Sequence, residues 1–116
     1  MIVNRQGEYV LFDFDAASIA FPLYDIAVFC DMTNYFNLSA HEYKDTRYML
    51  EEFMKGYSEY CPVSDRELTA IYSFIAIRHY EVQATIIENL GSLSIDKEFV
   101  DNQLKWLMSW EKLIQL

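Results

Sequence analysis

The chain has 116 residues, of which 53% are hydrophobic and 16% aromatic, enough for one packed domain and too many for a disordered chain. Its 18 acidic and 9 basic residues give a net charge of −9, which argues against nucleic acids and anionic membranes as partners because both attract a positive surface. Three glycines and two prolines are too few for the many tight turns of an all-β fold.

Several features indicate a cytoplasmic protein. The first residues lead directly into a strand-like segment, so no signal peptide is expected. Cys30 and Cys61 are isolated in apolar surroundings and are predicted to be buried, reduced thiols. No apolar run reaches the roughly 18 residues that a membrane-spanning helix needs. We therefore expect no membrane association.

Residues 1–13 are predicted to form a β-hairpin. Ile2 and Val3 make a short first strand, and the segment from Asn4 to Gly7 has turn chemistry, with Gly7 free to adopt a positive φ. The run Tyr9–Phe12 is continuously apolar and favours β-structure, which predicts a second strand that is buried on both faces.

Helix signals fill the remainder of the chain. Pro22 suits a first helical turn, and Ser39 and Ser64 each begin the pattern Ser-x-x-Glu, which satisfies two free amides at a helix start. Gly91 is a typical C-terminal signal. The predicted helices span residues 22–35, 39–59, 64–89 and 96–114. The fold class is therefore mainly α (α+β), a single domain of a hairpin followed by about four helices.

Asp13 and Asp15 follow the predicted second strand directly. Two carboxylates at the end of a buried strand could ligate Mg²⁺, which proteins commonly hold through one or two carboxylates together with nucleotide phosphates. The spacing Asp-x-Asp is also frequent in solvated loops, and from the residues alone that alternative stays open.

Two blocks carry a resemblance to a known family. The first is Val10-Leu11-Phe12-Asp13-Phe14-Asp15, and the second is Phe21-Pro22-Leu23-Tyr24-Asp25-Ile26-Ala27. Their order and spacing resemble the metal-binding segment of the aminoglycoside phosphotransferase and choline kinase superfamily. The resemblance implies a fold like the C-terminal lobe of a protein kinase. Residues 1–13 would be its hairpin, 14–21 a metal-binding-type loop and 22–116 the helical, substrate-side part.

The resemblance also implies roles for individual residues. Asp13 would bridge Mg²⁺ to the phosphates of ATP, Asp15 would support the metal, and Asp25 would hold the catalytic loop in place. The implied reaction is ATP-dependent phosphorylation of a hydroxyl on a small molecule. The acidic net charge favours a cationic substrate.

The family's catalytic motif, His-Gly-Asp-x-x-x-x-Asn, is absent from the sequence, as is the nucleotide-binding lobe. The catalytic base would lie upstream of Met1, so we expect a truncated, inactive piece of a kinase. Segments that are expected to pack against the missing parts would be exposed and would promote self-association into homo-oligomers. A non-catalytic helical module that binds a ligand or a protein is the alternative.

Aromatic residues and one histidine are further candidates. Tyr24, Tyr35 and Tyr43 could line a pocket for a cation through their ring faces, although core or boundary positions are the default interpretation. His79 lies on the apolar stripe of the third helix and is predicted to be a hydrogen-bonded core residue.

Overall fold

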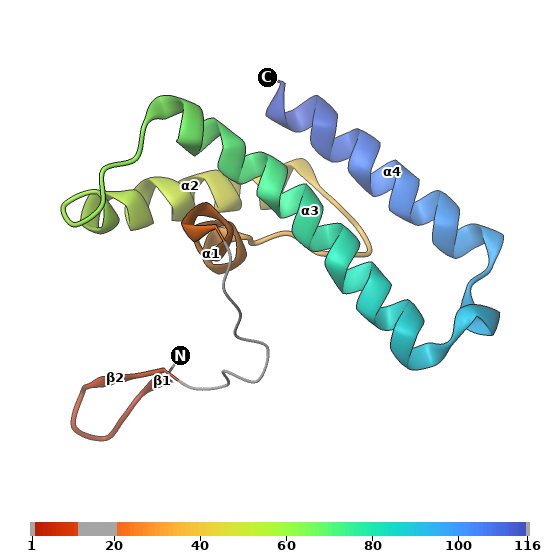
Figure 1. The fold of residues 1–116 in the computed structure, drawn as a ribbon, viewed down its shortest axis with the longest axis horizontal. Coiled ribbons are helices and arrows are strands. Elements are labelled where there is room, and N and C mark those ends of the chain that lie inside the picture. Colours follow the sequence, from red (N-terminus) through yellow and green to blue (C-terminus); the bar gives the residue numbers. More distant parts are fainter. Residues whose placement is uncertain (1, 12–20, 116) are drawn as a thin grey trace.

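A computed structural model describes residues 2–11 and 21–115. Its elements are two strands, four α-helices and one 3₁₀ turn (Figure 1). In chain order they are β1 (Ile2–Val3), β2 (Tyr9–Val10), α1 (Pro22–Cys30), α2 (Ala40–Tyr57), α3 (Asp65–Leu90), η1 (Ser92–Ser94) and α4 (Lys97–Ile114). The predicted class, a hairpin followed by four helices, is confirmed.

The hairpin is antiparallel, with Ile2 opposite Val10 and Val3 opposite Tyr9. Its turn is organised by Asn4, whose side-chain Oδ1 accepts hydrogen bonds from the backbone N–H groups of Gln6 and Glu8 at 3.0 and 2.9 Å. Gly7 has φ +80°, as the turn prediction requires. The described part of β2 is exposed, with 75% of Tyr9 accessible, so the prediction of a strand buried on both faces is wrong within this chain.

Both predicted capping boxes are present. The Ser39 hydroxyl accepts from the Glu42 amide at the start of α2, and the Ser64 hydroxyl accepts from the Glu67 amide at the start of α3. In each box the glutamate accepts a bond from the serine backbone N–H, so two amides without helical partners are satisfied. Gly91 ends α3 with φ +82°.

α1 is shorter than the sequence predicts, since it ends at Cys30 and not at Tyr35. The carboxylate of Asp31 accepts hydrogen bonds from the N–H and the hydroxyl of Thr33 at 2.9 and 2.6 Å, which competes with further helix. The next amide, that of Met32, donates to the Thr46 hydroxyl on α2 at 3.0 Å. A tertiary contact therefore replaces the helical bond.

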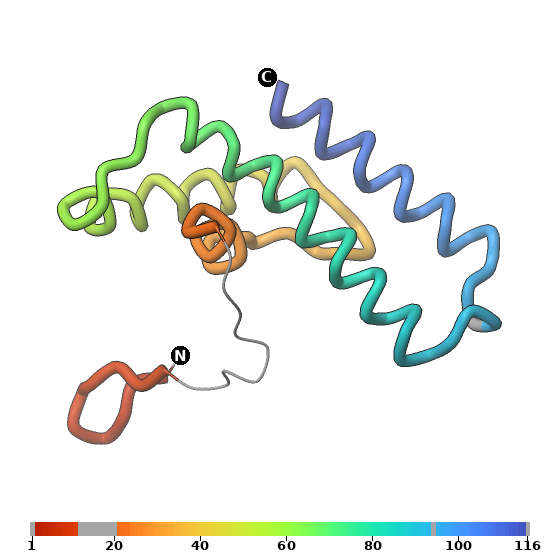
Figure 2. The backbone as a smooth tube through the Cα atoms, viewed as in Figure 1, coloured from red at the N-terminus to blue at the C-terminus, as the bar shows by residue number. Residues whose placement is uncertain are grey.

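α1 packs against α3 and α2, and α4 runs antiparallel to α3 on the opposite side (Figures 1 and 2). Two indole N–H groups tie α4 to the body: Trp106 donates to the carbonyl of Asn34 at 2.8 Å, and Trp110 to the carbonyl of Tyr72 at 2.9 Å. The apolar core consists of Ile26, Ala27, Cys30, Leu50, Ile71, Ile75, Trp106 and Trp110.

The cysteines differ from the prediction that both are buried. Cys30 is buried in the core, whereas Cys61 is exposed in the turn between α2 and α3, and both are free thiols. The helices of the described residues include none that is long and apolar enough to cross a membrane.

Candidate functional site

The start of α1 places several of the candidate residues. Pro22 occupies the first helical position and Asp25 the first turn, where a carboxylate is stabilised by the helix dipole. Ile26 and Ala27 are buried and fix the helix against the core. Asp25 consequently lies exposed, and Tyr24 is half-buried toward α3.

A polar cluster joins α1, the segment after it and α3. We call it the Arg78 cluster; its members are Tyr24, Asp31, Tyr35, Arg78 and Glu81. The Tyr24 hydroxyl donates to the Glu81 carboxylate, and the Tyr35 hydroxyl donates to Asp31 Oδ2 at 3.3 Å. Arg78 Nη1 lies 3.9 Å from Glu81 Oε2 and its guanidinium interacts with both phenols. Asp31 joins the cluster through Tyr35.

The pKa values of the cluster follow from burial and from these neighbours. Burial raises the pKa of Tyr24 and of Tyr35, and the carboxylates of Glu81 and Asp31 raise them further, while Arg78 opposes the change. Burial lowers the pKa of Arg78, but the two phenol oxygens outweigh it and the net change is upward. The phenols are therefore protonated donors at neutral pH, and the guanidinium is charged.

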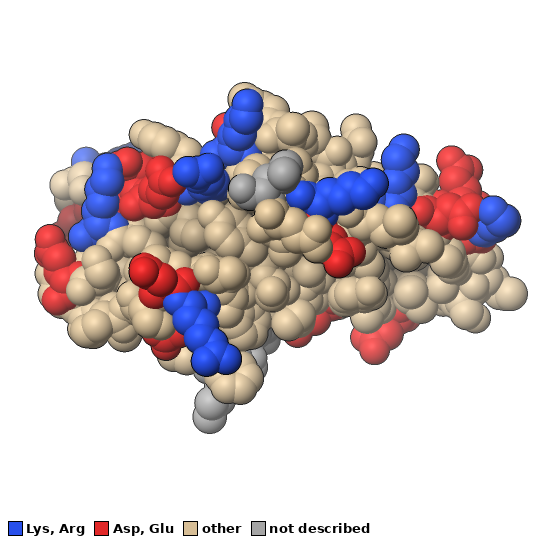
Figure 3. All heavy atoms as spheres, turned by 90° about the horizontal axis from the view of Figure 1, so that it is seen from above, with Lys and Arg blue, Asp and Glu red and all other residues tan. Residues whose placement is uncertain are grey.

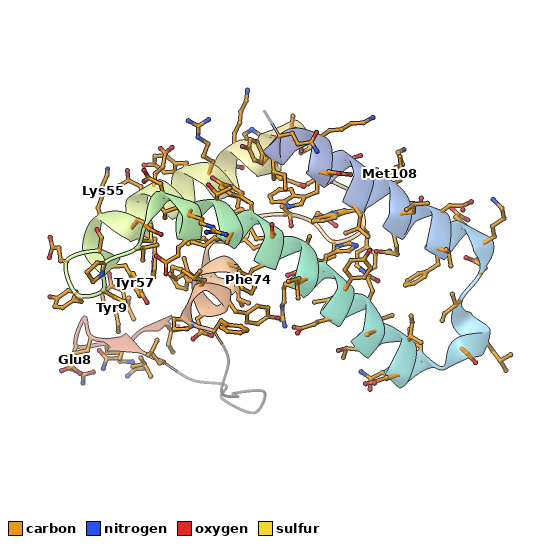
Figure 4. The ribbon with its side chains drawn as sticks, turned by 45° about the horizontal axis from the view of Figure 1, so that its top comes forward. Glu8, Tyr9, Lys55, Tyr57, Phe74 and Met108 are labelled. Atoms are coloured by element: carbon orange, nitrogen blue, oxygen red, sulfur yellow. The ribbon has the colours of Figure 1, made fainter. Side chains whose placement is uncertain are left out.

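An apolar groove of about 220 Å³ lies beside the start of α1. Its walls include Phe21 and Leu23 from the start of α1, Tyr57 from the end of α2, and Phe74 from α3 (Figure 4). The pKa of Tyr57 is raised, mainly by its hydrogen bond with the Cys61 thiol and to a smaller extent by the charge of Asp25. Asp25 thus lies near this groove.

The predicted site residues have different outcomes. Asp13 and Asp15 lie outside the described residues. Tyr24 and Tyr35 are brought together around Arg78. Tyr43 lies elsewhere, packed against Tyr72 and Trp110 with ring centroids 6.0 and 5.7 Å away. The three tyrosines therefore do not line one pocket.

No metal-binding group was found in the part of the chain that the structure describes: residues 2–11 and 21–115 contain no set of three His, Cys, Asp or Glu side chains that could hold an ion. Charges of both signs are interspersed on the face shown in Figure 3. Neither observation bears on Asp13 and Asp15.

The sequence did not reveal that Asp31 and Glu81 belong to the same cluster as Tyr24. Glu81 is 57 residues from its hydrogen-bond partner Tyr24, and no local pattern encodes that contact. A weak signal existed for Asp31, because the spacing Asp-x-Thr is typical of a side chain that closes a turn on its own backbone. Arg78 and Glu81 are three residues apart and share a helix face.

His79 belongs to the core, as predicted, but without the predicted hydrogen bond. Its side chain is buried, and Gln103 is its polar neighbour, but within the described residues the geometry at both ring nitrogens falls short of a hydrogen bond. Gln83 and Gln103 also have buried polar atoms without partners among those residues. Burial lowers the pKa of His79, while Gln103 and the charge of Asp31 oppose the change.

Comparisons with known proteins identify a relative from a bacterium. No family model and no solved structure matches the chain. An uncharacterized protein of Deinococcus radiodurans is 28% identical over 113 residues, which are 95% of this chain and 32% of that protein. The chain therefore spans about a third of the length of this relative.

Proposed function

We propose that the chain is the C-terminal, substrate-side part of an ATP-dependent small-molecule phosphotransferase of the aminoglycoside phosphotransferase type. With the rest of such an enzyme present, the γ-phosphate of ATP would pass to a hydroxyl of the substrate. By itself the chain would be inactive, because its sequence contains no His-Gly-Asp motif to supply the base.

One observation carries the proposal: the order of elements around the acidic segment. A hairpin precedes Asp13 and Asp15, and a helix begins at Pro22 with Asp25 exposed in its first turn. That order matches the order in the family that the sequence resembles. An exposed Asp25 is free to accept hydrogen bonds from a loop supplied by another part of the enzyme, which is its implied role.

The exposure of β2 and Phe21 also supports the proposal. Tyr9 is 75%, Leu11 65% and Phe21 74% exposed. Exposed apolar side chains in neighbouring segments are typical of surfaces that pack against another part of a protein. In the relative from Deinococcus radiodurans, the part outside the matching third is about twice as long as this chain.

The Arg78 cluster is a candidate for substrate contact. Its two carboxylates and two phenol rings could hold an ammonium group, and its guanidinium could hold a carboxylate. A hydroxylated amine or amino acid suits this mixture better than a neutral sugar. The cationic-substrate hypothesis is thus kept, with Tyr24 and Tyr35 in the Arg78 cluster and Tyr43 outside it.

Metal binding by this chain can be measured with Mn²⁺ as a paramagnetic substitute for Mg²⁺. We expect Mn²⁺ to broaden the NMR signals of residues near Asp13 first, and Asp13→Asn with Asp15→Asn to remove that broadening. Asp65→Asn is the matched control, because Asp65 is an exposed carboxylate in the first turn of α3. Broadening that persists at residues 11–21 in the double variant would contradict the metal role.

A non-catalytic binding module is the second candidate, supported by the exposed apolar residues outside the site. Ligand or protein binding that needs neither Mg²⁺ nor nucleotide and survives Asp13→Ala would favour it. ATP consumption by this chain alone would contradict the prediction that it is inactive.

A further inference from the structure

α4 has a second apolar face, and its side chains do not belong to the apolar core of the described residues. Val100, Leu104 and Met108 are 54%, 57% and 51% exposed, although each is a large aliphatic side chain. They are spaced by four residues, so they form one stripe along the helix. Met108 is marked in Figure 4 on α4. The core-facing side chains Phe99, Trp106 and Trp110 lie on the opposite face of the helix.

Charged residues continue this stripe at both ends. With 3.6 residues per turn, Lys97 and Glu111 fall within about 40° of the line through Leu104, as Val100 and Met108 do. Lys97 and Glu111 are both exposed, and Lys97 also pairs with Asp101 on its own helix, Nζ to Oδ2 at 2.5 Å. The face, which we call the α4 stripe, therefore reads Lys97, Val100, Leu104, Met108, Glu111 from its start to its end.

The α4 stripe is complementary to itself. If two copies of α4 pack antiparallel about a two-fold axis at Leu104, residues equally far from Leu104 on either side face each other. Val100 then faces Met108 of the second copy, both four residues from the axis, and Lys97 faces Glu111, both seven residues from it. The apolar residues meet apolar residues, and each of the two terminal pairs joins opposite charges.

The surface beside the stripe has a hollow that such a partner can enter. A depression of about 350 Å³ is lined by Leu104 and Met108, with Asp101, Lys105 and Lys112 at its rim. In the antiparallel arrangement, side chains of the second copy lie over the gap between Leu104 and Met108. Packing of a side chain into a hole on the facing helix is the usual geometry of paired helices.

We propose that the α4 stripe is a homodimer interface, in which two copies of this chain pair antiparallel about Leu104. The proposal is independent of the proposed phosphotransferase function, because the stripe lies on α4 and contains no member of the Arg78 cluster. A single helix pair is a small interface, so the dimer is expected to be weak and to depend on protein concentration and on salt.

Sedimentation of the full chain at increasing concentration tests the proposal. We expect a monomer–dimer equilibrium, shifted toward the dimer at low ionic strength. Leu104→Glu should weaken dimerisation by at least about tenfold, since it places two like charges on the axis. Ile77→Glu is the matched control: Ile77 is a 46% exposed aliphatic residue on α3, outside the stripe. Its dimerisation should equal that of the unaltered chain.

Charge reversal tests the antiparallel register itself. Lys97→Glu alone and Glu111→Lys alone each convert two attractive pairs into two repulsive ones, so each variant should dimerise more weakly, by about three- to tenfold. Lys97→Glu also removes the pair with Asp101 within α4. In a mixture of the two single variants, the heterodimer has two attractive pairs. In the double variant, the homodimer also has two attractive pairs. Circular dichroism checks that each variant retains its helix content.

Three results would overturn the proposal. A chain that is monomeric at every concentration would show that another part of a longer protein, or solvent alone, covers the stripe. A dimer that Leu104→Glu leaves unchanged would lie elsewhere on the molecule. A double variant, Lys97→Glu with Glu111→Lys, that dimerises no better than either single variant would exclude the antiparallel register.

Discussion

The imidazole ring of His79 lies against the indole ring of Trp106, with centroids 3.9 Å apart and ring planes 13° apart. This contact joins α3 to α4 and leaves His79 fully buried. Gln103 is the polar neighbour of the ring, but its geometry falls short of a hydrogen bond within the described residues. A charged imidazolium would therefore lose its hydration with little compensation, and the neutral form is favoured.

His79 is expected to make the protein less stable as the pH falls. Its native pKa is lowered by burial, opposed in part by Gln103 and Asp31, while an unfolded histidine has a pKa of about 6.5. Between the two values the unfolded state binds more protons, so the free energy of unfolding rises with pH in that window. Urea denaturation at several pH values should show this slope below about pH 6.5 and its disappearance above that pH.

The control for this prediction is the other histidine. His79→Gln should reduce the slope, whereas His41→Gln, which removes an exposed imidazole on α2, should leave it in place. If the His79→Gln variant does not fold, the NMR titration of His79 in the unaltered chain decides. A native pKa at or above the unfolded value would contradict the account.

The capping box of α3 should contribute measurably to stability. Ser64→Ala removes the acceptor for the Glu67 amide and is expected to cost about 1 kcal/mol. Ser73→Ala, an exposed change in the interior of the same helix, should be neutral or slightly stabilising because alanine is the better helix former. Equal losses in the two variants, measured by urea denaturation, would exclude a specific capping effect.

The two thiols should differ in reactivity. Burial raises the pKa of Cys30 to about 11, which leaves almost no thiolate at neutral pH, and the residue is inaccessible in the core. Cys61 is exposed. Ellman's reagent should therefore label one thiol quickly in the native protein and both in denaturant. Cys61→Ser should abolish the fast reaction, and a fast phase that survives this change would mean that Cys30 is accessible.

The hydroxyl groups of the three candidate tyrosines should have unequal importance. Tyr24→Phe and Tyr35→Phe each remove a hydrogen bond to a carboxylate and are expected to lower stability by about 1 kcal/mol. Tyr43 packs through its ring against Tyr72 and Trp110, so Tyr43→Phe should cost less than about 0.5 kcal/mol. Urea denaturation distinguishes them, and a larger loss at Tyr43 would contradict the assignment.

Local signals predicted the helix starts and failed where long-range contacts decide. Pro22, Ser39 and Ser64 mark the beginnings of three helices through local effects. Pro22 fixes its own φ and lacks an N–H, and each serine accepts a bond from an amide of its own segment. The predicted end of α1 lies beyond the observed one, because no local sequence pattern indicates that the Met32 amide bonds to Thr46. β2 was expected to be buried because its composition is apolar, yet burial depends on what covers it.

The candidate cluster was predictable only in part. The helix that follows the acidic segment could be found from Pro22, whereas the Arg78 cluster depends on α1 packing against α3. The sequence prediction for Tyr24 and Tyr35 rests on their ring faces, but their hydroxyl groups make the contacts that define the cluster. Composition could not separate them from Tyr43, which is equally aromatic and lies in the aromatic cluster around Trp110.

The most direct test of the proposed function uses the longer relative from Deinococcus radiodurans, which contains the matching third and the remainder of its own chain. Calorimetry should detect ATP binding that requires Mg²⁺ and is weakened about tenfold or more when the residue aligned with Asp13 is changed to asparagine. The same change at an exposed aspartate outside the aligned acidic segment provides the control. Absence of Mg²⁺-dependent nucleotide binding, or binding that the change at Asp13 leaves intact, would contradict the assignment of this chain to a phosphotransferase.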